Sequence, residues 1–90
     1  MPPGKGKPSA RSLALQILVR VERAEAQAKP LLEVALNRSG MPPEERALAT
    51  ALVQGVLRER GRLDYVLGQV CRPPRQPWVR NILRLGVYLL

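Results

Sequence analysis

Apolar residues recur at three- and four-residue steps in several segments of this chain, and proline or glycine stands at most breaks between them. Such spacing places apolar side chains on one face of an α-helix. The clearest segment follows Ser9, a residue type that caps helix starts. Its apolar positions are Leu13, Ala14, Ile17, Leu18, Val21 and Ala24. No stretch alternates convincingly with a period of two, so the pattern predicts an all-α fold, a helical bundle.

Four further segments bring the predicted number of helices to about five. A short second helix has Pro30 in its first turn and ends near Gly40. The third opens with the prolines and glutamates of residues 42–45, because prolines lack donors that a first turn leaves unpaired and acids complement its positive end. We expect the third helix to bury Leu48, Ala49, Leu52, Val53, Val56 and Leu57.

Two glycines and an aspartate stand out in and after the third helix. Gly55 lies inside this helix, where glycine costs about 1 kcal/mol relative to alanine, so we expect a neighbouring backbone to approach closely there. Gly61 is placed to end the third helix. Asp64 can then cap or begin the fourth.

A fifth helix follows the rigid turn that CRPPRQP predicts at residues 71–77. We expect Arg80, Arg84 and Tyr88 to lie away from its buried face. The expected buried face holds Val79, Ile82, Leu83, Gly86, Val87 and Leu90. Because the apolar pattern still runs at Leu90, we expect the helical domain of residues 9–90 to be incomplete at its C-terminal end.

The chain is strongly basic, with 15 lysines and arginines, seven aspartates and glutamates and a formal net charge of +8. Residues 1–20 carry +4, residues 21–57 carry −1 and residues 58–90 carry +5. Residues 1–8, rich in proline and glycine, predict a flexible basic arm. Such a charge attracts polyanions, among which nucleic acid is common. Twelve arginines against three lysines also fit a GC-rich genome, so composition leaves a neutral explanation open.

Residue types that commonly carry catalysis are scarce. The chain has no histidine, the commonest general base, and its single cysteine, Cys71, has no evident base partner. Its glycines do not form a phosphate-binding loop. We therefore expect no catalytic, cofactor-binding or metal-binding residue here. Since no signal peptide or apolar run of ~20 residues is recognisable, we expect a cytoplasmic chain without membrane association.

Three segments together resemble a known family. They are ARSLALQILVRVE at 10–22, ERALATALVQGVLRERGRLDYVL at 45–67 and VRNILRLGVYLL at 79–90. Their order, spacing and motifs are similar to those of the NusB-like domain over about residues 10–90. The Gly-Val-Leu-Arg block with Leu-Asp after it is typical of the branch that begins the bacterial 16S ribosomal RNA cytosine-5 methyltransferases called RsmB, Sun or Fmu.

The resemblance implies a NusB-like helical domain that contacts RNA, in this branch 16S rRNA, or supports the methyltransferase domain of its parent chain. It also implies that the catalytic cysteines and the S-adenosylmethionine site lie in a part of that parent beyond residue 90, so that this chain is non-catalytic.

Other functions stay open. One is a protein-interaction module that docks on the catalytic domain, and another is a free-standing NusB-type transcription antitermination factor. A helix-turn-helix DNA binder is disfavoured, because the turns around residues 37–45 and 71–77 are longer and richer in proline than a turn of ~3–4 residues.

The expected RNA contacts are basic side chains near the two ends of the chain. Lys5, Lys7 and Arg11 match the N-terminal basic region that contributes to RNA contact in NusB. Arg58 matches the family's recurrent arginine after Gly-Val-Leu. For Arg58 and Arg62 a structural role is equally open, since cations at a helix C-terminus are favoured by ~0.3–1 kcal/mol. The residues are Lys5, Lys7, Arg11, Arg58, Arg62, Arg80 and Arg84.

Overall fold

The structure is a computed structural model that describes residues 9–24, 27–72 and 74–90. Within these residues it contains five helices and no strand, which confirms the all-α prediction. The helices are α1 (Ala10–Ala24), α2 (Ala28–Ser39), α3 (Pro43–Arg58), α4 (Arg60–Val70) and α5 (Pro77–Tyr88). The basic arm expected at residues 1–8 lies outside the described residues. None of the described helices is long and apolar enough to cross a membrane.

Local sequence signals explain several helix boundaries. The Ser9 hydroxyl accepts a hydrogen bond from the Ser12 N–H at 3.1 Å, which satisfies a donor that the start of α1 leaves free. Gly40 follows α2 with a φ of 69°, a left-handed conformation that glycine adopts without steric cost. Pro43 stands in the first turn of α3 and is followed by two glutamates. These three boundaries lie where the sequence predicts them.

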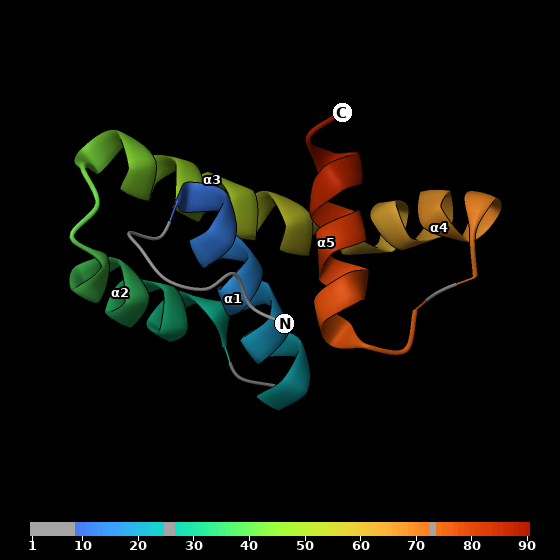
Figure 1. The fold of residues 1–90 in the computed structure, drawn as a ribbon, viewed down its shortest axis with the longest axis horizontal. Coiled ribbons are helices and arrows are strands. Elements are labelled where there is room, and N and C mark those ends of the chain that lie inside the picture. Colours follow the sequence, from blue (N-terminus) through green and yellow to red (C-terminus); the bar gives the residue numbers. More distant parts are fainter. Residues whose placement is uncertain (1–8, 25–26, 73) are drawn as a thin grey trace.

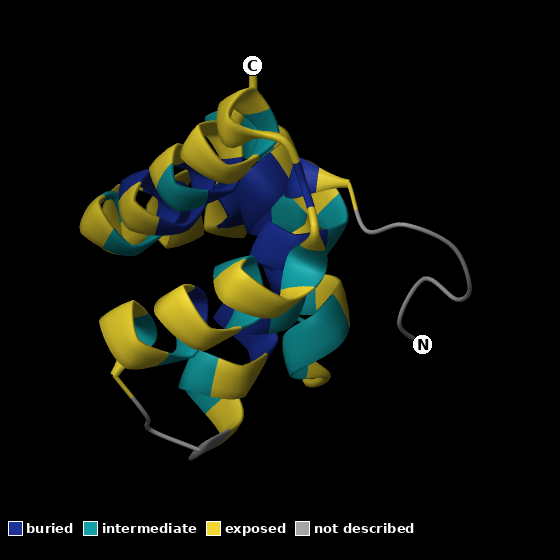
Figure 2. Cartoon of the chain, turned by 90° about the vertical axis from the view of Figure 1, so that its left-hand side faces the viewer, coloured by how far each residue is buried: buried dark blue, intermediate teal, exposed yellow. Residues whose placement is uncertain are grey.

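Helix α1 occupies the centre of the molecule. It packs against α2, α3 and α5, and α5 stands between α1 and α4 (Figure 1). The inward faces of the helices are buried and the outward faces exposed (Figure 2). A fully buried valine, leucine or isoleucine side chain stabilises a fold by ~1.5–3 kcal/mol. The main core comprises Ala14, Ile17, Leu18, Leu32, Leu52, Val53, Val56, Leu63 and Leu85.

One residue of α3 does not follow the expected pattern. Leu48 is 45% exposed, so the prediction that it is buried is wrong. The buried face of α3 is formed by Ala49, Leu52, Val53 and Val56. Leu48 therefore lies at the edge of this face rather than in the core.

The junction between α3 and α4 also differs from expectation. Glu59 alone separates the two helices, and Gly61 lies inside the first turn of α4 instead of ending α3. The helical hydrogen bonds nearly continue across the junction, because the Glu59 N–H donates to the Gly55 carbonyl at 3.0 Å and the Leu63 N–H donates to the Glu59 carbonyl at 2.9 Å. Asp64 lies within α4 and caps neither helix.

Gly55 is close to a side chain and not, as expected, to a neighbouring backbone. A Cβ atom at this position would overlap the phenol ring of Tyr88 on α5. The absence of a side chain at residue 55 therefore lets α5 pack against α3.

The buried face of α5 is the largest departure from the sequence prediction. Asn81, Arg84 and Leu85 are buried, whereas Val79 and Ile82, expected in the core, are 38% and 43% exposed. The helix is rotated in this way because its polar residues bind acidic side chains of α1 and α4. An apolar face of α5 is left exposed as a result.

Candidate nucleic-acid interface

The α3–α4 junction carries a cluster of exposed arginines. Arg58, Arg60 and Arg62 flank Glu59, and all three are exposed. The Arg62 Nε donates to Glu59 Oε1 at 2.8 Å, and the Arg62 side chain remains 60% exposed. An exposed ion pair of this kind contributes only ~0–1 kcal/mol, so it does not commit Arg62 to a structural role.

Arg58 is the last residue of α3. Among the described residues, no hydrogen bond or ion pair involves its side chain. The Glu59 N–H, and not an arginine, donates to carbonyl groups at the end of this helix. The guanidinium of Arg58 is therefore free to bind an external anion. It also lies at the C-terminal end of α3, where the helix dipole favours a cation.

Arg84 is buried, so the expectation that it projects from a helix surface is wrong. Its Nε donates to Asp64 Oδ1 at 2.6 Å and its Nη2 donates to Asp64 Oδ2 at 2.8 Å, a bidentate pair that joins α5 to α4. Its side chain is only 7% exposed. A buried guanidinium is stable here because it is paired, and this pairing leaves it unavailable to RNA.

Arg80 is also bound within the protein. Its Nε donates to Glu22 Oε1 at 2.8 Å and its Nη1 donates to the Pro74 carbonyl at 2.6 Å. Only 24% of its side chain is exposed. Arg80 thus links the turn before α5 to α1, and little of its side chain is accessible to a ligand.

Glu22 joins these groups from α1. It accepts hydrogen bonds from Arg80 and from Asn81 Nδ2, the latter at 3.0 Å, and lies 3.4 Å from Arg84 Nη1. Partial burial alone would raise the pKa of Glu22, but the Arg80 hydrogen bond and charge, the Arg84 charge and the Asn81 hydrogen bond outweigh it and lower the pKa below 4.5. Within the part of the chain that the structure describes, no buried side-chain nitrogen or oxygen lacks a partner.

The remaining predicted contacts lie near the N-terminus. Arg11 is exposed in the first turn of α1, beside a groove of about 250 Å³ that also involves Ile82 and Gly86 of α5 and Leu89, the residue after that helix. Lys5 and Lys7 lie outside the described residues. The structure therefore leaves Arg11, Arg58 and Arg62 as exposed candidates.

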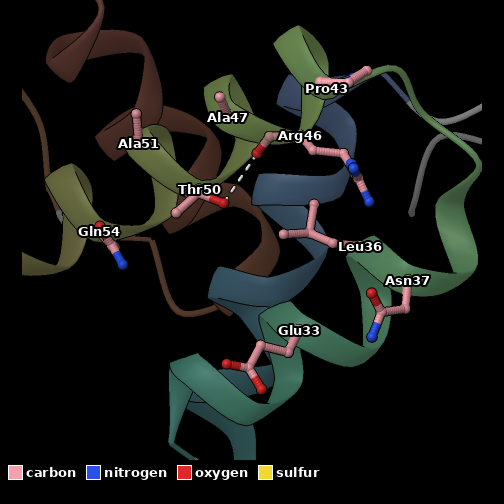
Figure 3. A pocket seen from close by; sticks show the side chains of 9 residues that line it. All are labelled: Glu33, Leu36, Asn37, Pro43, Arg46, Ala47, Thr50, Ala51 and Gln54. Atoms are coloured by element: carbon pink, nitrogen blue, oxygen red, sulfur yellow. Dashed lines mark hydrogen bonds between the residues drawn. The ribbon is translucent and has the colours of Figure 1, made fainter.

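A wider cleft, which the sequence did not predict, lies between α2 and α3. Its volume is about 660 Å³, and Figure 3 shows polar side chains of both helices around it. The row Arg46, Thr50 and Gln54 was recognisable as an exposed stripe from its four-residue spacing. The lining residues are Glu33, Leu36, Asn37, Pro43, Arg46, Ala47, Thr50, Ala51 and Gln54.

The described residues show no group of three or more cysteine, aspartate or glutamate side chains that could hold a metal ion. Cys71 is exposed, and its thiol lies 3.4 Å from the Leu67 carbonyl.

These features define a small, basic, all-helical domain with arginines exposed where two helices meet. A model of the NusB family matches residues 8–90, and the chain belongs to that family.

Proteins of two kinds are similar to this chain in sequence. The chain is 34% identical over 84 residues to the probable ribosomal RNA small subunit methyltransferase B of Bacillus subtilis, with 91% of this chain and 19% of that protein covered. It is 45% identical over 78 residues to the ribosomal RNA small subunit methyltransferase B of Thermus thermophilus, with 84% and 19% covered. It is 33% identical over 82 residues to the transcription antitermination protein NusB of Desulforudis audaxviator, with 87% and 59% covered.

The chain thus spans about a fifth of the length of the methyltransferases it matches. No solved structure shows significant similarity to it.

Proposed function

We propose that this chain is the RNA-binding, non-catalytic part of a ribosomal RNA methyltransferase, with 16S rRNA as its ligand. The observation that carries the proposal is the similarity of nearly the whole chain to about a fifth of such methyltransferases. The net charge of +8 and the exposed arginines of the α3–α4 junction give the domain the means to hold a polyanion. S-adenosylmethionine would be bound by the remainder of the parent protein, in the cytoplasm.

The proposed contacts are Arg58 and Arg62 at the junction and Arg11 at the start of α1. Lys5 and Lys7 join them on the strength of the family resemblance alone. Such side chains bind mainly phosphates, which positions the domain on the RNA without selecting a sequence. Arg80 and Arg84 are not part of the proposed interface, since their guanidinium groups bind Glu22 and Asp64.

Fluorescence anisotropy with a labelled 16S rRNA fragment tests the proposal. A DNA duplex of equal phosphate number serves as the control ligand, at about 0.15 M ionic strength. We expect tighter binding to the RNA. Equal affinity for both ligands, or no binding to either, would contradict RNA binding as the function.

A second measurement tests the non-catalytic part of the proposal. Incubation of the chain with 16S rRNA and radiolabelled S-adenosylmethionine should transfer no methyl group, because the sequence has one cysteine and no histidine, and the Cys71 thiol lies beside the Leu67 carbonyl and not beside a base. Stoichiometric incorporation of label into the RNA would contradict it.

A second candidate function is docking on the catalytic part of the same parent protein. The exposed apolar residues Val79 and Ile82 of α5, with Leu89 just after the helix, favour this function, since clustered exposed apolar residues commonly mark protein interfaces. Co-purification with the separately expressed catalytic part tests this function. Ile82→Asp should abolish the complex and leave RNA affinity unchanged, and an unaffected complex would exclude this face.

A further inference from the structure

Among the aromatic residues of the chain, Tyr65 on α4 lies mostly in solvent. The sequence has three aromatic residues, all within the described part, and Tyr65 is 70% exposed, whereas Trp78 and Tyr88 are half-buried. Helix α4 packs beside α5 and buries Leu63 and Leu67 (Figure 1). Positions two residues apart on an α-helix are separated by about 200°, so Tyr65 lies on the side of α4 opposite to this buried face. Its ring therefore does not serve the core.

The neighbours of Tyr65 on the surface of α4 leave its ring accessible. Residues three and four positions apart are neighbours on a helix. Two of these positions hold Gly61 and Gly68, and a Cβ atom at either glycine would meet nothing within 4 Å. Glycine costs a helix about 1 kcal/mol relative to alanine, so α4 loses stability at the two positions that would otherwise cover the ring. A flat group can therefore approach Tyr65.

The ring also lies next to the arginines of the α3–α4 junction. Arg62 is three residues before Tyr65, and long side chains on a helix point back toward its N-terminal end, which favours a ring close to Arg62. The two acidic residues of this stretch, Glu59 and Asp64, bind Arg62 and Arg84. An exposed aromatic ring and exposed guanidinium groups are thus neighbours on one surface.

We propose that Tyr65 stacks on an unpaired RNA base while Arg58 and Arg62 hold the adjoining phosphates. The inference rests on the RNA-binding function proposed above and adds a contact to the bases, which phosphate-binding arginines do not provide. Aromatic side chains stack on the bases of single-stranded RNA, and such stacking accepts every base because each has a π-face. Residues 58–90 carry a net charge of +5, so a polyanion with planar groups fits this surface better than a neutral protein surface does.

Two single-stranded ligands of equal charge test the proposal: a ten-residue uridine tract and a ten-residue ribose–phosphate chain without bases. We expect the wild-type chain to bind the uridine tract at least ~5-fold more tightly in fluorescence anisotropy, because stacking stabilises the bound base. Tyr65→Ala should remove this difference by weakening binding to the uridine tract alone. The log–log salt slope of Tyr65→Ala should stay at the wild-type value, because a stacked base releases no counterion.

Two further variants are the matched controls. Tyr65→Phe keeps the ring and should keep the preference for the uridine tract. Val70→Ala removes another exposed apolar side chain from α4, which is 77% exposed, and should also keep the preference.

Equal affinity of the wild-type chain for the two ligands overturns the stacking proposal but leaves phosphate binding by the arginines intact. No binding to either ligand also overturns it, and the proposed function is wrong as well only if the 16S rRNA fragment is not bound. If Tyr65→Ala weakens binding to both ligands equally, the ring does not contact a base and the proposal is wrong. If Tyr65→Ala keeps the preference and instead loses binding to the parent's catalytic part, the ring belongs to a protein-docking surface and the proposal is again wrong.

Discussion

Glu22 is the acidic residue of α1 that contacts the polar side chains of α5. It binds Arg80 and Asn81 and lies beside Arg84, so removing its charge leaves two arginines with fewer partners. We expect Glu22→Gln to lower the free energy of unfolding by ~1–3 kcal/mol, because the substitution removes the charge of a partly buried carboxylate that accepts hydrogen bonds from α5. Urea denaturation measures the change.

Glu59→Gln is the matched control, because it removes the same charge from the exposed pair with Arg62. Its effect should stay below ~1 kcal/mol. Equal effects of the two substitutions would contradict the importance of the buried cluster.

The same residue should make stability depend on pH. Because the pKa of Glu22 is lowered in the folded state, its stabilising contribution is fully present above its ordinary value of 4.5 and is lost as the pH falls through the lower folded value. The difference in unfolding free energy between wild type and Glu22→Gln should therefore be constant above about pH 5 and shrink below 4.5. A difference that is independent of pH down to about pH 3 would be inconsistent with this assignment.

At the scale of the helices, Gly55 controls how closely α3 and α5 pack. Gly55→Ala should destabilise the protein by ~1–3 kcal/mol despite the higher helix propensity of alanine, because the new methyl group overlaps Tyr88. In α4, Gly68 has open space around it, so Gly68→Ala should instead stabilise by up to ~1 kcal/mol. Thermal melts of both variants provide the measurement, and a stabilising Gly55→Ala would show that the contact with Tyr88 is easily relieved.

The helices themselves were predictable from the sequence, but the buried face of α5 was not. Apolar residues of α1 recur every three or four positions, and Gly40 and Pro43 mark the break before α3, so local patterns suffice there. Burial of Arg84 depends on Asp64, 20 residues earlier, and on Glu22, 62 residues earlier. Periodicity treats an arginine as exposed and cannot show that another helix brings it a carboxylate.

The candidate interface was also predictable only in part. Arg58 and Arg62 are exposed as expected, because their exposure follows from the end of one helix and the start of the next. The cleft required the relative position of α2 and α3, which no local pattern contains.

At the scale of the whole molecule, stability should come from the core around α1 and not from the outer face of α5. Leu52 is 2% exposed, so Leu52→Ala should destabilise by ~2–5 kcal/mol. Ile82 is 43% exposed, and Ile82→Ala should change stability by no more than ~0.5 kcal/mol. Urea denaturation of both variants tests this. Similar large losses for the two would mean that the exposed face of α5 is covered in solution.

The net charge of the domain predicts how its affinity for a polyanion should depend on salt. With +8 on 90 residues, attraction to RNA is long-ranged and depends on salt, because each neutralised phosphate releases bound counterion. A local contact by Arg58 and Arg62 must therefore be separated from the general effect of net charge. Arg20→Gln/Arg23→Gln removes the same charge from exposed positions of α1 and provides that control.

The most direct test of RNA binding by the α3–α4 junction is the salt dependence of the dissociation constant for a single-stranded 16S rRNA fragment, measured from about 0.05 to 0.2 M salt. Arg58→Gln/Arg62→Gln should weaken binding and flatten the log–log slope by about 0.7 for each lost phosphate contact. The α1 control should leave the slope close to that of the wild type. If the junction variant instead loses thermal stability while its affinity and slope stay at the wild-type values, the two arginines serve the helix ends and the proposed interface is wrong.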